Sequence, residues 1–275
     1  QLQILQLKKS RLKAFPGYVF KNNSFLNNFY KNHMPFDLTN AQKRVIKECY
    51  ENMCSKKQMN RLIQGDVGSG KTIVAFLCML FPVESGAQVA FMAPTEVLAE
   101  QHFKSVLGLA KKLNLSVELL TGSTKPKERD ILLNNLLIGK TNILIGTHAL
   151  IEERVRFKKL GLVVIDEQHK FGVAQRAKLW SKKEEYYPHV LVMTATPIPR
   201  TLALTLYGDL DVSVIDELPK GRKEIITSHR NDNSRLKVLN FIKQTVESGS
   251  QVYIVYPLIE ESAKKDHKDL MDGYE

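Results

Sequence analysis

The chain has 275 residues, of which 43% are hydrophobic and 25% are charged, so its composition is that of a globular domain and excludes a largely disordered chain. The formal net charge of +11 favours a polyanionic partner such as nucleic acid, although a basic surface that serves solubility would explain the charge equally well. Three cysteines without C-x-x-C spacing indicate a reducing compartment, and the sequence shows no signal peptide or apolar run of membrane-spanning length. We expect a cytoplasmic protein.

The first 35 residues are expected to link the main domain to a region further upstream. Residues 1–14 alternate Leu and Ile with Gln and Lys, as in an amphipathic helix. A turn at Pro16 and Gly17 follows, and then a polar, Asn-rich stretch that extends to His33.

A regular pattern begins at Asp37, where Thr39 or Asn40 is expected to cap the start of a helix. Gln42 lies in the first turn of this helix. Its side-chain amide offers a donor and an acceptor side by side, which suits the edge of adenine. An ordinary capped helix start explains Gln42 almost as well.

Residues 65–72 form a complete G-x-x-x-x-G-K-[ST] phosphate-binding loop. A short apolar strand, Arg61–Gln64, precedes it and an apolar helix, Thr72–Leu80, follows it, which is the setting that the motif requires. The glycines allow backbone N–H groups to point at phosphate oxygens, and the lysine reaches the outer phosphates. The alternative is a glycine turn before an ordinary helix. The residues expected to hold a nucleotide are Gly65, Asp66, Val67, Gly68, Ser69, Gly70, Lys71 and Thr72, and the hydroxyl of Thr72 is expected to ligate Mg²⁺.

Short apolar runs then alternate with longer, charged segments of helical period such as Glu96–Leu113 and Lys125–Leu137. The apolar runs are Val89–Ala93, Val117–Leu120, Ile143–Ile145, Leu162–Ile165 and Val190–Met193. Continuous apolar strands between helices predict an α/β fold in which helices cover both faces of a parallel sheet. The functional loops of such a sheet lie at the carboxyl ends of its strands.

Two carboxylates, Asp166 and Glu167, follow one of these strands directly. A strand aimed at the phosphate loop would place Asp166 at Mg²⁺ and Glu167 at the attacking water as general base. Alone, the pair is weak evidence, because acidic residues commonly begin loops or cap helices. The next strand ends at Thr194 and Thr196, whose hydroxyls would bond the carboxylate loop and sense the γ-phosphate; a Thr-rich turn stopped by proline is the alternative.

The pattern breaks at residues 218–222, where Pro219 and Gly221 interrupt it. A strand at Ile225–Ser228, a helix at Ser234–Glu247 and a strand at Gln251–Tyr256 are then expected to begin a second, incomplete α/β unit. We therefore divide the chain into a linker or helix (1–35), an ATP-binding lobe (36–218), and a linker with the truncated start of a second lobe (219–275).

In chain order, the Gln42 segment, the phosphate loop, Asp166-Glu167-Gln168-His169 and Thr194-Ala195-Thr196 resemble the motor of superfamily 2 helicases, with its RecA-like lobes. Longer stretches, at 65–72, 166–173, 193–202, 208–219 and 257–262, are similar to the RecG family of bacterial fork-remodelling translocases. The resemblance covers about residues 36–262. Transcription-repair coupling factors share the stretch at 194–202 but usually read D-E-E-Q at 166–169, and so rank second.

The resemblance implies a motor that hydrolyses ATP with Mg²⁺, rewinds stalled forks and moves Holliday junctions. It assigns catalytic roles to Lys71, Asp166, Glu167, Gln168 and His169, the last two linking the nucleotide to Thr194 and Thr196. Residues assigned to DNA are Pro94, Thr95, Gly122, Ser123, Thr147 and His148, with Arg176 and Arg200 as further basic candidates for which a local salt bridge is as good an explanation. His102, His189 and His229 have no metal-like spacing and are treated as ordinary.

The resemblance also implies forked or branched DNA as partner, single-strand DNA-binding protein as a second partner, no membrane, a monomer, and a place in the bacterial cytoplasm near the nucleoid. The wedge domain and most of the second lobe, which carries the arginine finger, are not in this sequence, so weak ATP binding and slow hydrolysis are expected of it. Two other functions stay open: a DNA-binding or docking module in which the nucleotide is structural, and an RNA motor.

Overall fold

The computed structural model describes residues 15–167, 186–196, 210–219 and 225–255. The chain separates into two compact units, residues 1–222 and residues 223–275.

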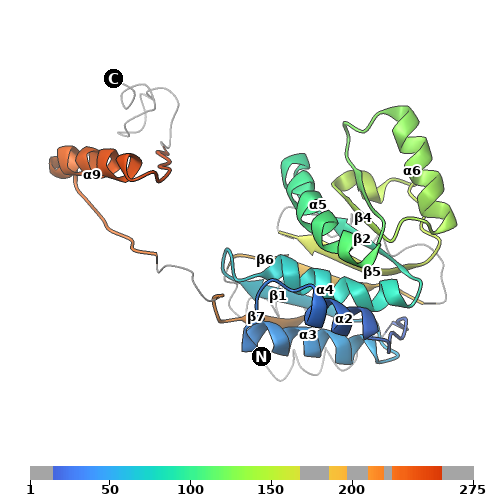
Figure 1. Ribbon diagram of the computed structural model, residues 1–275. Helices are drawn as coiled ribbons and strands as arrows, with labels where there is room; N and C mark the ends of the chain where they lie inside the picture. The colour runs from blue at the N-terminus through green and yellow to red at the C-terminus, as the bar shows by residue number, and fades with distance from the viewer. Residues whose placement is uncertain (1–14, 168–185, 197–209, 220–224, 256–275) are drawn as a thin grey trace, which may run out of the picture. The chain divides into compact units, whose positions relative to one another are not determined.

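Within the described part of the first unit, seven strands form one parallel sheet in the order β3-β4-β2-β5-β6-β1-β7 (Figure 1). The strands are β1 (Asn60–Gly65), β2 (Gln88–Met92), β3 (Val117–Leu120), β4 (Ile143–Gly146), β5 (Leu160–Asp166), β6 (His189–Thr194) and β7 (Asp211–Ile215). The predicted parallel α/β sheet is confirmed. The edge strand β7 was not predicted, because Asp211 and Ser213 interrupt the continuous apolar run that marks the inner strands.

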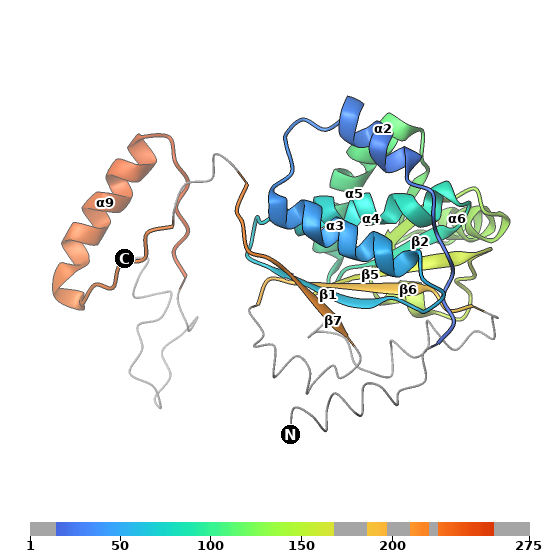
Figure 2. The ribbon, with the colours of Figure 1, turned by 90° about the horizontal axis from the view of Figure 1, so that it is seen from below.

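Helices cover both faces of this sheet, as predicted (Figures 1 and 2). The helices are α2 (Ser24–Asn32), α3 (Asn40–Met53), α4 (Lys71–Glu84), α5 (Glu96–Ala110) and α6 (Pro126–Ile138), with short 3₁₀ turns at Lys111–Leu113 (η1) and His148–Ile151 (η2). Alternate strand residues divide between two apolar cores: Ile63 and Phe91 pack with α2–α5, whereas Leu62 and Met92 pack with α6 and η2. Helix α4 is apolar around its whole circumference because it lies between the sheet and helices α2 and α3.

Helix α2 lies in the stretch that the sequence marks only as polar and Asn-rich. Its apolar residues share one side of the helix, and Phe29 is fully buried with its ring 5.2 Å from that of Phe76 on α4. Phe20, further upstream, is also buried in this core. The described part of residues 1–35 therefore packs against the lobe. The domain boundary that the sequence places between residues 35 and 36 stays a prediction.

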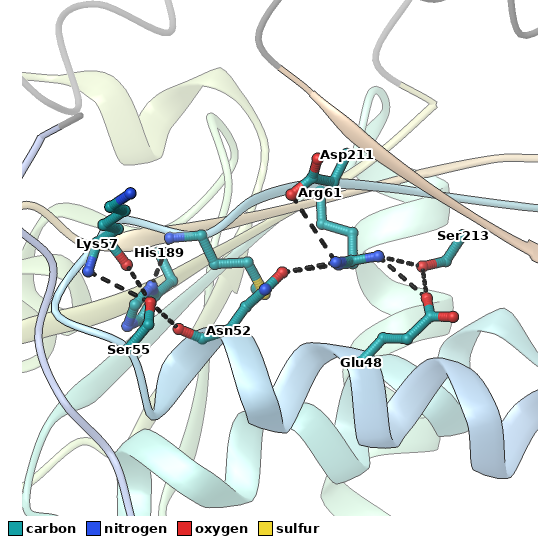
Figure 3. A network of polar contacts seen from close by, with 9 residues as sticks. Glu48, Asn52, Ser55, Lys57, Arg61, His189, Asp211 and Ser213 are labelled. Carbon is teal, nitrogen blue, oxygen red and sulfur yellow. Dashed lines mark hydrogen bonds and ion pairs between the residues drawn. The ribbon is translucent and has the colours of Figure 1, made fainter. Parts of the chain in front are cut away.

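A network around Arg61 connects three elements at one edge of the sheet (Figure 3). The guanidinium of Arg61, on β1, donates to Glu48 Oε2 at 3.0 Å and to Asn52 Oδ1 at 2.6 Å, both on α3, and to Ser213 Oγ on β7 at 2.6 Å. The Arg61 side chain is only 9% exposed. A buried guanidinium requires such partners, so the network holds β7 and α3 to β1.

The segment after β7 is also tied to α3. The backbone N–H of Ala41 donates to Glu217 Oε2 at 3.2 Å, and Arg44 donates to Asp216 Oδ1 at 2.9 Å. The bond from Arg44 lowers the pKa of Asp216.

His189 begins β6 at the amino edge of the sheet and is fully buried. Its Nδ1 accepts from the backbone N–H of Met59 at 2.8 Å, so the proton of the neutral ring is on Nε2, which donates to the carbonyl of Tyr18 at 2.8 Å. Burial lowers the pKa of His189 to about 4. The ring thus ties the segment before α2 to the sheet.

In the second unit, helix α9 (Arg235–Glu247) forms as predicted, with Ser234 at its N-cap position. The strand predicted at Ile225–Ser228 is wrong, and so is the strand predicted at Gln251–Tyr256 over its described residues, 251–255. A strand requires a neighbour for its backbone groups, and these segments pair with no other described residue. Their apolar side chains are accordingly exposed: Ile226 is 88% and Val255 89% exposed.

Candidate functional site

The phosphate-binding loop joins the end of β1 to the start of α4. Gly68 and Gly70 have φ values of +76° and +85°, which favour glycine. Gly70 is also the N-cap of α4, and a Cβ at this position would lie 2.3 Å from Gln42 Nε2. The loop therefore turns tightly onto a helix N-terminus, as an anion-binding loop must.

Lys71 lies at the first position of α4. Its ammonium group donates to the carbonyls of Gly65 at 2.8 Å and Asp66 at 3.0 Å. Two carbonyl oxygens of the loop thus bind the ammonium group of Lys71, which the sequence predicts to contact the outer phosphates of a nucleotide.

Gln42 is almost fully buried against the back of this loop. Its Nε2 donates to the carbonyl of Ser69 at 2.8 Å, and its Oε1 accepts from the backbone N–H of Thr39 at 2.9 Å. With the bond from Gln42 N–H to Thr39 Oγ1, this is a capping box, so Thr39 is the N-cap of α3. Both ends of the amide are used within the protein, and the contact of Gln42 with adenine stays a prediction.

Asp166 and Glu167 end β5 beside the phosphate loop. Glu167 has a φ of +51°, a strained value for a residue with a side chain. Its carboxylate accepts from the backbone N–H of Ala195 at 3.0 Å and from Thr194 Oγ1 at 3.4 Å, and Thr194 Oγ1 lies 2.8 Å from Thr196 Oγ1. Glu167 is therefore bonded to the segment of Thr194 and Thr196, to which the sequence also links Gln168 and His169.

His102, which sequence reasoning treated as ordinary, lies in this site. Its Nε2 is 2.8 Å from Asp166 Oδ2. The signal that identifies it is helical spacing, because the side of α5 that faces the site carries Leu98, Gln101, His102, Ser105 and Leu109, which all line one cavity.

These groups line a cavity of about 540 Å³. It is lined by Gly68, Lys71, Thr72, Asp166, Glu167 and Ala195, together with Phe36, Val67, Ile73 and the residues of α5. The structure thus brings the loop and both carboxylates to one place. Thr72 and Asp166 supply oxygen ligands of the kind that Mg²⁺ prefers.

The residues assigned to DNA lie at the ends of β2, β3 and β4, at the same carboxyl edge of the sheet. Pro94 is half-buried, whereas Thr95, Gly122, Ser123 and His148 are exposed. Glu96 joins two of these loops by accepting from Ser123 Oγ at 3.0 Å. Thr147 differs, since its side chain is buried at 2% exposure and does not reach the surface.

Gln168, His169, Arg176 and Arg200 lie outside the described residues, and their roles stay predictions. Within the described residues, no group of three or more His, Cys, Asp or Glu side chains is arranged to hold a metal by itself. No helix in that part of the chain is long and apolar enough to span a membrane.

The sheet is parallel, with the phosphate loop at the end of β1, hydroxyls at the end of β6 and an acidic pair at the end of β5. This arrangement is typical of a nucleotide-binding α/β lobe. Residues 39–205 match the DEAD/DEAH box helicase family, which is more than half of the chain, and the chain belongs to that family.

Within this family the chain is similar to RecG proteins. It is 49% identical, over 275 residues, to the ATP-dependent DNA helicase RecG of Aquifex aeolicus (strain VF5), covering 100% of this chain and 35% of the relative. It is 52% identical to that of Bacillus subtilis (strain 168), covering 100% of this chain and 40% of the relative. A solved structure of RecG bound to a three-way DNA junction matches with a TM-score of 0.80 and 46% identity, over 94% of this chain and 34% of that one. The chain thus spans little more than a third of the length of these relatives.

Proposed function

We propose that this chain is the ATP-binding lobe, with the beginning of a second lobe, of an ATP-dependent DNA helicase that acts on branched DNA. One observation carries the proposal: Lys71, Thr72, Asp166 and Glu167 line one cavity in a chain that is about half identical to RecG helicases over its whole length. The match to RecG bound to a three-way junction supports branched DNA as the substrate. Reversal of stalled forks and migration of Holliday junctions are the reactions that we propose for the whole protein.

The residues of the loop fit a nucleotide with Mg²⁺. Gly68 and Lys71 line the cavity, and the positive φ of Gly70 turns the loop onto the N-terminus of α4, as a phosphate group requires. Thr72 and Asp166 are the residues that would hold the metal ion. Bound Mg²⁺ neutralises charge on the outer phosphates.

The side chains of the site have distinct proposed roles. Lys71 exchanges the carbonyls of Gly65 and Asp66 for phosphate oxygens, which frees both carbonyls. Glu167 takes the proton of the attacking water, and its two bonds from Ala195 and Thr194 hold the carboxylate in place. A change in the position of the Glu167 carboxylate on hydrolysis would therefore also move Thr194 and Thr196, which are bonded to it directly and in series.

At the other loops of the carboxyl edge, we propose that Thr95, Ser123 and His148 contact the DNA backbone. Exposed hydroxyls and backbone N–H groups contact phosphates without reading the sequence, which suits a motor that moves along DNA. The net charge of +11 supports the same partner. A monomer, a location near the bacterial nucleoid and an interaction with single-strand DNA-binding protein are proposed from the resemblance to RecG alone.

Nucleotide binding and hydrolysis by this chain, with and without forked DNA, test the proposal against a Lys71→Ala control. We expect calorimetric binding of ATP that the substitution weakens at least about tenfold, and turnover that forked DNA stimulates and the substitution abolishes. Equal ATP binding by the two chains, or DNA binding that does not respond to salt, would contradict the proposal.

A further inference from the structure

His102 and Asp166 form a pair at the wall of the nucleotide cavity. His102 Nε2 lies 2.8 Å from Asp166 Oδ2, and each side chain is only 13% exposed. Because an ionised carboxylate can only accept, the ring proton must be on Nε2. The bond uses the carboxylate oxygen Oδ2, and Asp166 lines the cavity together with Lys71 and Thr72.

The imidazole ring of His102 also packs against the ring of Phe91. Its centre lies 4.6 Å from the centre of the Phe91 ring, at an angle of 36°. Phe91 is fully buried on β2, where it pairs with Val164 of β5, two residues before Asp166. The sheet that carries the carboxylate therefore also fixes the ring that bonds to it.

We propose that His102 is a positioning residue, which holds the carboxylate of Asp166 in the orientation that binds the Mg²⁺ of the bound nucleotide. This inference rests on the proposed function and deepens it. Partners of metal-ligating carboxylates restrict rotation of the ligand, and their loss typically costs about 10–100-fold in metal affinity. His102 acts through Asp166 and does not touch the substrate.

Two substitutions separate the hydrogen bond from the packing. His102→Phe keeps a ring against Phe91 but removes the N–H donor. His102→Gln keeps an N–H donor at a similar reach but removes the ring. His102→Leu is a second variant without a donor, in case the larger phenylalanine ring perturbs folding, and thermal melting of each chain reports whether it is folded.

The measurement is the calorimetric affinity of the 275-residue chain for a non-hydrolysable ATP analogue, first in EDTA and then as Mg²⁺ is added. We expect equal affinities in EDTA for all chains. The Mg²⁺ concentration that restores tight binding should rise about tenfold in His102→Phe and His102→Leu, whereas His102→Gln should stay near the wild type.

Two results would overturn the inference. One is a wild-type response to Mg²⁺ in the chains that lack a donor, and the other is a loss in His102→Gln as large as the loss in His102→Leu, which would show that the ring and not the donor matters. In both, the wild type still binds the analogue and the proposed function stands. A wild-type chain that binds no analogue under either condition would remove the proposed function, and this inference with it.

Discussion

The carboxyl edge of the sheet has two halves, and they hold their polar groups differently. At the ends of β1, β5 and β6, polar side chains are held by bonds within the protein. Gln42 donates to the backbone carbonyl of Ser69, His102 bonds to Asp166, and Glu167 accepts from the backbone N–H of Ala195 and from Thr194 Oγ1. At the ends of β2, β3 and β4, Thr95, Gly122, Ser123 and His148 are exposed, and the carboxylate of Glu96 connects two of these loops by accepting from Ser123 Oγ.

This difference follows from what each half is proposed to bind. A nucleotide site must hold charges in fixed positions before the ligand arrives, because reorganisation during the reaction costs rate. A surface that grips successive phosphates of a moving polymer requires accessible donors of moderate strength. We call the first group of strand ends the nucleotide half and the second the nucleic-acid half.

Helix α5 contributes to both halves. It begins at Glu96, whose carboxylate bonds to Ser123 in the nucleic-acid half. Within two turns it carries His102, which bonds to Asp166 in the nucleotide half. Helix α5 therefore contacts both halves directly, through a carboxylate in its first turn and an imidazole within two turns of it.

The largest expected effect is a loss of ATP hydrolysis, caused by a substitution in the nucleotide half that leaves DNA binding intact. Glu167→Gln keeps a side-chain oxygen that can accept from the backbone N–H of Ala195 but removes the general base, so hydrolysis should fall about 10²–10⁴-fold. Nucleotide affinity and salt-dependent DNA binding should remain near the wild type. Steady-state turnover measured beside calorimetric binding gives both values.

The control for this variant is Ser123→Ala, in the nucleic-acid half. It should weaken DNA binding and leave basal hydrolysis, measured without DNA, unchanged. If Glu167→Gln lowered DNA affinity as strongly as Ser123→Ala, the two halves would not be separate sites.

The amino edge of the sheet offers a second comparison, because a fully buried histidine lies there. Burial lowers the pKa of His189 from 6.5 to about 4. The unfolded chain therefore binds this proton at a higher pH than the folded chain, and stability falls as pH decreases from about 6.5 to about 4. A shift of this size corresponds to about 3 kcal/mol of unfolding free energy.

Urea unfolding across this pH range measures that loss. His189→Gln cannot titrate, so its stability should depend less on pH while its bonds to Met59 and Tyr18 are largely replaced by those of the amide. Parallel pH profiles for the two chains would contradict the assignment to His189.

Much of the fold could be predicted from the sequence, because its patterns are local and do not depend on which distant residues they contact. Strands such as Val89–Ala93 are continuous apolar runs, and the phosphate loop is defined by its glycines and lysine. Strand β7 was missed because its polar residues are satisfied by a distant partner, as Ser213 is by Arg61. The strand predicted over 251–255 is wrong for the converse reason, since its apolar residues have no described neighbour to pair with.

The site shows the same limit. The sequence identifies Lys71, Asp166 and Glu167 because their types and order carry the chemistry. It did not identify His102, because the bond to Asp166 spans 64 positions of the chain and depends on how α5 lies across the sheet. It also placed Thr147 at the DNA, whereas the structure buries its side chain.

A smaller effect tests how tightly the nucleotide half is built. Gly70→Ala places a Cβ 2.3 Å from Gln42 Nε2 at a φ of +85°, so it should destabilise the chain by about 2 kcal/mol and weaken ATP binding. The matched control is Gly108→Ala in α5, where a Cβ meets nothing within 4 Å and should stabilise the helix by about 0.5–1 kcal/mol. Urea unfolding gives the free energy of unfolding of the two chains. A Gly70→Ala chain as stable as the control would show that the loop can rearrange at little energetic cost.

The smallest expected effect lies in the nucleic-acid half, at Thr95. Its hydroxyl caps α5 by accepting from the backbone N–H of Leu98 at 3.3 Å, so Thr95→Ala should cost about 1 kcal/mol in urea unfolding. Thr95→Asp keeps the cap but places a negative charge at the exposed loop, so stability should be retained while affinity for forked DNA falls several-fold at low salt. Because the two variants affect different measurements, a Thr95→Asp chain that binds DNA as the wild type does would place the DNA away from this loop.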